Sequence, residues 1–283
     1  MIGRLLVENI VKRLFKGKAL LLFGARQVGK TTLIEQLLNN SEDSVLHISG
    51  DEPDIRERFK SITSTQRIQN IGLTLKLITD KLKNIQVIAT GSSTFEMANQ
   101  MNEPLTGRKF EFTLFPLSFK ELVNHHGLIE EKRQLEQRLI YGAYPEVVTS
   151  IDDKEELLSL ISDSYLYKDI LMLDTIKRPK LLHNILKALA LQIGSEVSFN
   201  EVAQLVRADK GTVEKYIHLL EQTFVIFTLP SYSRNVRNEL KKSKKIYFYD
   251  CGIRNAIIGN FSPIQNRTDI GALRENYLIA ERI

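Results

Sequence analysis

The segment Gly24-Ala25-Arg26-Gln27-Val28-Gly29-Lys30-Thr31 matches the phosphate-binding pattern G-x-x-x-x-G-K-[S/T] without a gap. The apolar run at 19–23 before it predicts a buried strand, and residues 31–38 after it predict a helix with one apolar face. A strand, a glycine-containing turn and a helix in this order are the context in which the pattern forms a phosphate-binding loop. The segment therefore predicts an α/β fold with a nucleotide site at the start of this helix.

Each part of this loop has an expected role. The glycines let successive backbone N–H groups turn toward phosphate oxygens, and the helix N-terminus adds partial positive charge. Lys30 is expected to reach the β- and γ-phosphates of ATP, and the Thr31 hydroxyl to complete the shell of a Mg²⁺ ion. Arg26 occupies a variable position of the pattern, so no catalytic role is assigned to it. The candidate binding residues are Gly24, Ala25, Arg26, Gln27, Val28, Gly29, Lys30, Thr31 and Thr32.

The composition is that of an ordinary globular protein. The chain has 283 residues, of which 43% are hydrophobic and 26% charged, with a formal net charge of +5. No apolar stretch reaches the roughly 18 residues that a membrane span needs. Residues 1–18 mix charged and apolar side chains, which predicts an amphipathic helix and not a signal peptide. The single cysteine, Cys251, excludes an internal disulfide. Together these features predict a cytoplasmic protein without a membrane partner.

The chain divides near residue 155. Residues 1–154 alternate strand-like and helix-like runs, which predicts a parallel sheet covered by helices. The expected strands after the first lie at 44–48, 85–90 and 110–115, and a helix is expected over 71–82. Residues 155–260 are mostly helical until a late pair of β-like runs. No Pro/Gly/Ser-rich linker separates the two parts, so close packing between them is expected.

An acidic strand end, which P-loop ATPases use to hold Mg²⁺ and polarise water, is not evident. Between Glu52 and Ile85 no long apolar run leads into an Asp-Glu pair. Asp51-Glu52 is the nearest substitute by composition, although an acidic turn after a strand is the favoured interpretation of this pair. Asp80 follows a segment with helical periodicity. ATP hydrolysis is therefore expected to be impaired.

Further motifs extend along nearly the whole chain. They are Gly24–Leu33, Ala89-Thr90-Gly91-Ser92-Ser93, Leu105-Thr106-Gly107-Arg108, Leu114–Phe119, Gly142-Ala143-Tyr144-Pro145-Glu146, Tyr247–Gly252 and Gly271–Asn276. This ordered set resembles the prokaryotic AAA-type ATPases that carry a C-terminal winged-helix and restriction-endonuclease-like region. The resemblance implies an AAA-type ATP-binding domain over 1–154, a helical and winged-helix domain over 155–260, and the start of a truncated nuclease-like region over 261–283.

The resemblance also assigns roles and shows two departures. Thr90, at a strand end, would contact the γ-phosphate or orient water, and Arg108 would neutralise transition-state charge in its own chain or in a neighbouring subunit of a homo-oligomer. Ser92 follows Thr90 at the same strand end, and a capping or turn role is the alternative for Ser92 and Ser93. An ordinary surface arginine is the alternative for Arg108. Asp250 matches an Asp-x-Gly motif, which favours a structural role. The family's Asp-Glu strand is replaced here by residues 65–70, and the chain stops at Ile283, as in a degenerate or truncated member.

A second pattern predicts a winged helix-turn-helix. Ser198–Glu201 has the spacing of a capping box before a helix with Val202, Leu205 and Val206 inward. A second helix over 210–222 buries Val213, Ile217 and Leu220, and runs 224–227 and 246–249 are typical of a wing. The candidate DNA-binding residues are Lys210, Thr212, Lys215, Arg234, Arg237, Lys241, Lys242, Lys244 and Lys245.

Two interpretations of this module remain open. Double-stranded DNA is one partner that the basic residues fit, whereas Glu214 and Glu221 on the same helix would repel phosphate. A protein partner or a purely structural role is the alternative. The sequence as a whole favours an ATP-binding protein of the AAA ATPase type. A nucleotide-gated DNA-binding module without significant hydrolysis, or a degenerate fragment, is the alternative.

Overall fold

The computed structural model describes residues 2–39, 46, 71–92, 105–164, 178–230 and 244–283. The predicted strand at 44–48, the Asp51-Glu52 pair and the segment 65–70 fall outside these residues, apart from Leu46. The chain forms two compact units. The strand–helix unit comprises Arg4–Gly24 and Gly29–Leu114, and the helical unit comprises Met1–Gly3, Ala25–Val28 and Phe115–Ile283. The boundary near residue 115 lies earlier than the division near 155 that the sequence predicts.

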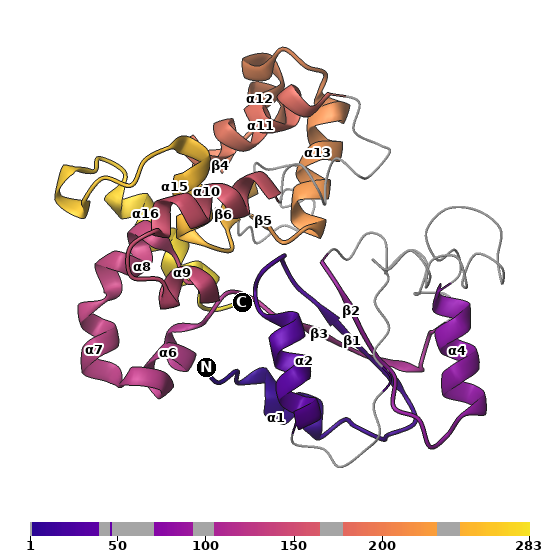
Figure 1. The fold of residues 1–283 in the computed structure, drawn as a ribbon. Coiled ribbons are helices and arrows are strands. Elements are labelled where there is room, and N and C mark those ends of the chain that lie inside the picture. The colour runs from indigo at the N-terminus through magenta and orange to yellow at the C-terminus, as the bar shows by residue number, and fades with distance from the viewer. Residues whose placement is uncertain (1, 40–45, 47–70, 93–104, 165–177, 231–243) are drawn as a thin grey trace. The chain divides into compact units, whose positions relative to one another are not determined.

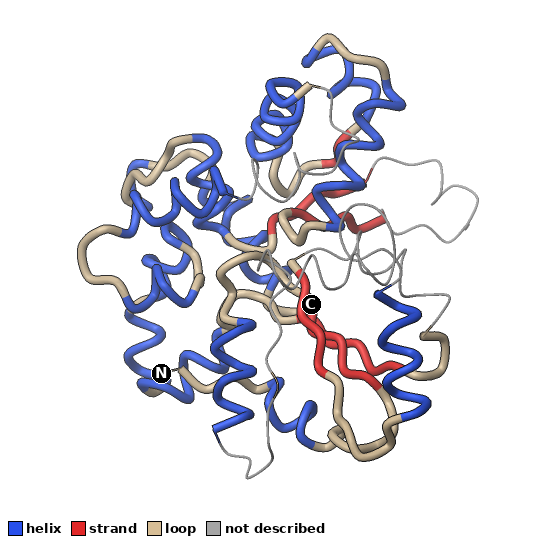
Figure 2. Tube along the Cα trace, turned by 45° about the vertical axis from the view of Figure 1, so that its right-hand side comes forward, coloured by secondary structure: helices blue, strands red, loops and turns tan. Residues whose placement is uncertain are grey.

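The strand–helix unit is built on three parallel strands. Its elements are α1 (Leu6–Val11), β1 (Ala19–Phe23), α2 (Lys30–Asn39), α4 (Ile71–Lys81), β2 (Ile88–Gly91) and β3 (Lys109–Thr113). The order is β2-β1-β3, with Phe23 in register with Gly91 on one side and with Thr113 on the other. Figures 1 and 2 show α2 on one side of the sheet and α4 on the other. The parallel, helix-covered sheet agrees with an α/β P-loop fold.

The sheet core follows from the apolar runs. All five residues of β1 are buried, as expected for a central parallel strand covered on both faces. Leu33 and Leu37 of α2 are buried, and Leu75 is buried in α4. Leu82, which the helical spacing placed on the same face as Leu75, lies after the end of α4 and is 48% exposed.

The predicted amphipathic helix over 1–18 is wrong in extent. The helix α1 ends at Val11, and Phe15 and Gly17 then adopt positive φ angles of 55° and 70°. A right-handed helix cannot continue through such residues. The predicted strand 85–90 likewise begins later, at Ile88. Before it, the Gln86 side chain donates to the Lys18 carbonyl and accepts from the Phe15 N–H.

The first half of the helical unit is a series of short helices. They are α6 (Phe119–His126), α7 (Leu128–Arg133), α8 (Leu135–Tyr141), α9 (Pro145–Thr149) and α10 (Lys154–Ser164). A capping box between Ser118 and Glu121 starts α6. A positive φ at Gly127 separates α6 from α7, and one at Gly142 ends α8. These turns fold the chain back on itself so that α8 and α10 both pack against the later helix α15.

The second half contains an antiparallel sheet framed by helices. Its elements are α11 (Pro179–Leu191), β4 (Glu196–Val197), α12 (Phe199–Val206), α13 (Lys210–Gln222), β5 (Ile226–Pro230), β6 (Lys244–Phe248), α15 (Cys251–Ile258), the 3₁₀ helix η2 (Ile264–Asn266) and α16 (Ile270–Ala280). The strand order is β4-β6-β5. Val213, Ile217 and Leu220 are buried in α13, as the sequence predicts.

Two details of α12 differ from the sequence-based expectation. Ser198 lies at the N-cap of α12, but its side chain makes no capping hydrogen bond. Leu205 is 65% exposed, whereas Val202 is fully buried. The helix α12 ends at Val206, with Arg207 in a left-handed conformation. Its buried residues are Val202 and Ala203, and Leu205 lies off that face.

Candidate nucleotide site

The phosphate loop begins directly after β1 at Gly24, a position where the structure has no room for a side chain. Gly24 has a φ of 151°, and a Cβ atom there would lie 2.2 Å from the Leu114 carbonyl oxygen at the end of β3. Leu114 in turn donates its N–H to the Phe23 carbonyl at 2.8 Å. The close approach of β1 and β3 therefore requires glycine at this position and fixes where the loop begins.

The loop then turns into α2. Gln27 and Gly29 have positive φ angles of 59° and 92°, and the first helical residue is Lys30. The first N–H groups of a helix have no partner within the helix, so the start of α2 presents donors and partial positive charge at this point. This is the arrangement that binds phosphate groups.

The functional side chains lie at this helix start. The Lys30 Nζ donates to the Gly24 carbonyl at 2.8 Å, so the ammonium group lies across the loop. Thr31 and Thr32 are exposed, and Ala25 and Val28 are buried. Arg26 is half-buried and Gln27 is exposed. The sequence-predicted binding residues thus form one continuous loop in which Lys30 and the two threonine hydroxyls are the polar groups suited to phosphate and Mg²⁺.

Thr90 lies at the same edge of the sheet as the loop. It is in register with Leu22, one residue before the end of β1, and its side chain is exposed. Ser92 directly follows β2, and Ser93 lies outside the described residues. Because the carboxyl ends of parallel strands share one edge, Thr90 and Ser92 are in position to approach a phosphate group held by the loop.

Arg108 lies at the opposite edge. Its carbonyl accepts the Ala19 N–H, so it stands at the beginning of β3 beside the beginning of β1. The five residues of β1 separate it from the phosphate loop, a distance of about 16 Å along the sheet. Its Nε donates to Asp80 Oδ1 at 2.8 Å. A role for Arg108 at the nucleotide of its own chain is therefore not compatible with this placement, because the sheet lies between.

The same ion pair bears on Asp80 as a substitute metal ligand. Asp80 is located at the end of α4, where the hydrogen bond from Arg108, with Lys83 and Lys76 nearby, lowers its pKa. This carboxylate is thus held at the amino edge and not beside Thr31. Among the described residues, no group of three or more His, Cys, Asp or Glu side chains could hold a metal ion.

The predicted DNA-binding residues are mostly engaged with other side chains where they are described. Lys210 pairs with Glu214 at 3.3 Å, the Thr212 hydroxyl donates to Asp209 at 2.6 Å, and Lys245 pairs with Glu275 at 2.9 Å. Lys215 and Lys244 are exposed. The remaining candidates, Arg234, Arg237, Lys241 and Lys242, lie outside the described residues.

A buried polar network connects three of the sequence motifs, Gly142–Glu146, Tyr247–Gly252 and Gly271–Asn276. The Asp250 carboxylate accepts the N–H groups of Ala143 at 2.7 Å and Ile253 at 2.9 Å, which caps α15 and joins it to the turn after α8. The Asn276 side chain accepts from the Phe248 N–H and donates to the Phe248 carbonyl, which docks α16 on β6. Asp250 therefore has a structural role, as the sequence suggested.

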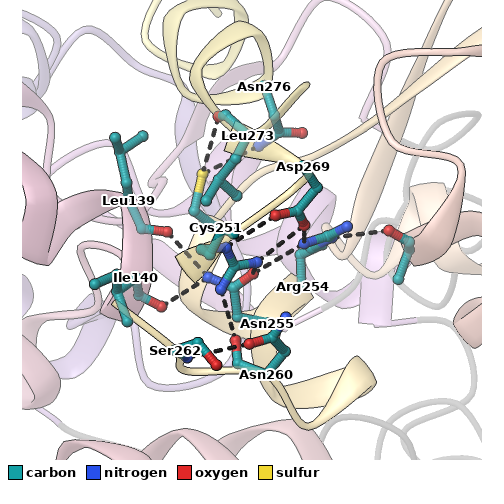
Figure 3. A network of polar contacts seen from close by, with 12 residues as sticks. Leu139, Ile140, Cys251, Arg254, Asn255, Asn260, Ser262, Asp269, Leu273 and Asn276 are labelled. Carbon is teal, nitrogen blue, oxygen red and sulfur yellow. Dashed lines mark hydrogen bonds and ion pairs between the residues drawn. The ribbon is translucent and has the colours of Figure 1, made fainter. Parts of the chain in front are cut away.

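Figure 3 shows the centre of this network. Asn255 donates to the carbonyls of Leu139 and Ile140, and its side-chain oxygen accepts from Arg254. Arg254 also pairs with Asp269 and donates to the Ala190 carbonyl. Buried charges persist when they are paired and hydrogen-bonded, so this cluster holds α8, α11 and α15 in one arrangement. Sequence reasoning missed Arg254, Asn255 and Asp269, since nothing in their spacing indicates these partners.

Comparison with known proteins agrees with the geometry of the loop. Residues 16–123 match an AAA domain. This match supports an AAA-type P-loop ATPase assignment and nucleotide binding of the AAA type. Residues 132–263 match a domain of unknown function (DUF8612). None of the described helices has the combination of length and hydropathy that crossing a membrane requires.

Similar proteins occur in distant prokaryotes. An uncharacterized protein of Haemophilus influenzae is 26% identical over 263 residues, which cover 87% of this chain and 62% of the relative. An uncharacterized protein of Methanocaldococcus jannaschii is 25% identical and covers 88% of this chain and 64% of the relative. One of Mycobacterium tuberculosis is 21% identical, with 95% and 63% covered. The chain thus spans less than two thirds of the length of these curated relatives.

Proposed function

We propose that this chain binds Mg·ATP at the loop formed by residues 24–32. The observation that carries the proposal is the junction of the fully buried β1, a turn with positive φ at Gln27 and Gly29, and a helix that begins at Lys30. The AAA match over residues 16–123 supports the same interpretation. Backbone N–H groups of the loop would surround the phosphates, and the start of α2 would add partial positive charge.

The side chains of Lys30, Thr31 and Thr90 have separate proposed roles. On ATP binding, Lys30 would exchange the Gly24 carbonyl for the β- and γ-phosphates, and the Thr31 hydroxyl would complete the Mg²⁺ shell. Thr90, at the carboxyl end of β2, would orient the attacking water or contact the γ-phosphate. ATP hydrolysis to ADP and phosphate is proposed as an impaired activity, because none of the described strands β1, β2 and β3 ends in an Asp-Glu pair.

Arg108 fits this scheme only through a second subunit. Its place at the amino edge, where 42% of its side chain is exposed, is compatible with a guanidinium that approaches the nucleotide of a neighbouring chain. Such a role requires a homo-oligomer and requires Arg108 to exchange Asp80 for the nucleotide. A structural ion pair at the amino edge is the alternative role.

Calorimetry of nucleotide binding tests the proposal. Wild type should bind Mg·ATP, and Lys30→Ala should weaken binding at least tenfold, or about 1.4 kcal/mol, since it removes a charge-assisted contact to two phosphates. Lys215→Ala, an exposed lysine of α13, is the matched control and should leave the affinity unchanged. Equal affinities of wild type and Lys30→Ala would refute the nucleotide site.

We further propose that residues 179–248 form a winged helix. The element order α11, β4, α12, α13, β5, β6 and the strand order β4-β6-β5 support it. The carboxylates that pair with Lys210 and Lys245 favour a structural or protein-binding role for this module over contact with duplex DNA.

A further inference from the structure

The amino edge of the parallel sheet, where its three strands begin, is strongly basic. Lys12, Arg13, Lys16 and Lys18 precede β1, Lys81 ends α4, Lys83 lies between α4 and β2, and Arg108 and Lys109 are at the start of β3. We call these residues the basic edge. The phosphate loop lies at the other end of the same strands, so the basic edge is a separate surface of the strand–helix unit.

Hydrogen bonds between the three entering segments bring these cations together. Ala19 donates its N–H to the Arg108 carbonyl, and Leu20 donates to the Val87 carbonyl, both at 2.9 Å. The Gln86 side chain spans from the Lys18 carbonyl, at 3.0 Å, to the Phe15 N–H, at 2.6 Å. Because neighbouring strands lie about 5 Å apart, the three segments enter the sheet within about 10 Å. The positive charges therefore add over one small surface.

Acidic residues neutralise two cations of the basic edge and leave the others in excess. Asp80 is paired with Arg108, and Glu111 with Lys109 at 2.5 Å. In the part of the chain that the structure describes, Lys12, Lys16 and Lys81 form no ion pair, and all three are exposed. These lysines are thus available to a ligand, and the ligand that a surface of several unpaired cations attracts is a polyanion.

Two aromatic rings stand among the cations. Arg13 and Lys18 both lie over the Phe110 ring, at 4.8 and 4.9 Å from its centre, which orders their charged groups. Phe15, directly before Lys16, is 57% exposed. Its backbone has a φ of 55° and is held by the Gln86 hydrogen bond, so the ring is presented by a fixed turn.

We propose that the basic edge binds single-stranded nucleic acid, with its cations on the phosphates and Phe15 stacked on a base. An exposed ring beside unpaired lysines is the combination that unpaired bases recognise, because a duplex hides the base faces. An anionic membrane fits less well, since α1 has only six residues and offers no long amphipathic face. The edge lies about 16 Å along β1 from the phosphate loop, so ATP and nucleic acid would bind together without competing.

The test uses the full chain and a fluorescent oligothymidine of about 20 nucleotides, with affinity measured by anisotropy over a salt series. Wild type should bind, and the double variant Lys12→Gln, Lys16→Gln should lower the log–log salt slope by about 1.4, or about 0.7 for each phosphate that is no longer neutralised. Phe15→Ser should lower the affinity about tenfold and leave the slope unchanged, because it removes stacking and not charge.

Control variants and alternative ligands complete the design. The double variant Lys120→Gln, Lys132→Gln removes two exposed lysines of α6 and α7, outside every proposed binding surface, and should change neither slope nor affinity. Unchanged Mg·ATP affinity in each variant would show that the fold is intact. An unchanged salt slope in the Lys12/Lys16 variant would overturn the proposal. Binding of the protein to vesicles that contain anionic lipid, without binding to the oligonucleotide, would also overturn it. Equal affinity for the oligothymidine and for the matching duplex, together with an unchanged affinity in Phe15→Ser, would overturn the single-strand specificity.

Discussion

Arg108 and Asp80 form an ion pair with 2.8 Å between Nε and Oδ1 at the amino edge of the sheet. Arg108 lies at the entry to β3 and Asp80 near the end of α4, and the phosphate loop lies at the other edge. From the sequence alone, both residues could have acted at the nucleotide, Asp80 as a metal ligand and Arg108 as a positive charge. The ion pair removes Asp80 as a metal ligand beside Thr31, and it removes Arg108 from the nucleotide of its own chain.

The placement of Arg108 predicts how a variant behaves. Arg108→Ala should leave the Mg·ATP affinity of the chain within about twofold of wild type, because the side chain lies about 16 Å from the loop. If Arg108 acts on the nucleotide of a neighbouring subunit, the Arg108→Ala protein by itself should show no turnover. Mixing it with Lys30→Ala chains, which keep Arg108, should restore part of the turnover. Calorimetry measures the first effect, and a phosphate-release assay on the mixture measures the second. A large loss of affinity in Arg108→Ala would contradict the geometry.

ATP turnover in the chain as it stands should be slow. Phosphoryl transfer depends on a placed metal and an oriented water, and losing one such element costs roughly two or more orders of magnitude in rate. Thr90→Ala should lower the remaining Lys30-dependent turnover further and leave Mg·ATP affinity nearly unchanged, since Thr90 is proposed to act on water. Robust Lys30-dependent turnover in wild type would instead point to Asp51 or Glu52, outside the described residues, as the acid.

Gly142 should tolerate no side chain. A Cβ atom there would lie 2.1 Å from an Asp250 carboxylate oxygen, and the φ of 71° already disfavours an L-residue. Gly142→Ala should therefore destabilise the protein by about 2–4 kcal/mol in urea unfolding. Gly127→Ala is the control, because Gly127 has a similar φ of 91° with nothing within 4 Å of the added carbon. Equal losses in the two variants would show that backbone strain, and not the contact with Asp250, decides the effect.

Asp250 predicts a component of the pH dependence of stability. Burial raises the pKa of its carboxyl from 3.8 to about 6, against the lowering effect of the backbone N–H groups of Ala143 and Ile253. A group whose pKa is raised in the folded state contributes stability that is fully present below 3.8 and is lost as the pH rises through 6. This contribution amounts to about 2 kcal/mol between pH 7 and pH 4.

The variant Asp250→Asn isolates this contribution. Wild type should gain stability relative to Asp250→Asn as the pH falls from 7 to 4, even though Asp269 and Glu275, whose pKa values are lowered, act in the opposite direction in both proteins. Unfolding free energies of the two proteins across this range give the difference directly. A difference that does not change with pH would mean that folding leaves the pKa of the Asp250 carboxyl at its unfolded value.

The wing lysines provide a separate test of binding to duplex DNA. Replacing Lys241, Lys242, Lys244 and Lys245 with Gln should lower the log–log salt slope of duplex binding by about 0.9 for each lysine that neutralises a phosphate. Because Lys245 is already paired with Glu275, the total decrease should be smaller than four independent lysines would give. An unchanged slope, measured by anisotropy, would assign the module to structure or to a protein partner.

The features that the sequence predicts correctly are those that depend on residues close together along the chain. The strand at 19–23, the loop and the helix after it follow from apolar periodicity and glycine positions, which act within a few residues, and the structure agrees with them. The buried face of α13 was predictable in the same way. The end of α1 was not, because it depends on a turn that Gln86 holds from 71 residues away.

Consecutive residues supply every group that the nucleotide loop needs, so the order of amino acids was enough to specify this loop. Only the packing of the folded chain put Arg108 at the far edge from the loop, paired Glu275 with Lys245, and made Asp250 join α15 to the turn after α8. The same packing brings three short cationic segments together at the basic edge. Charges and hydrogen-bonding groups act through space over a few ångströms, so their partners are set by how strands and helices pack and not by spacing along the chain.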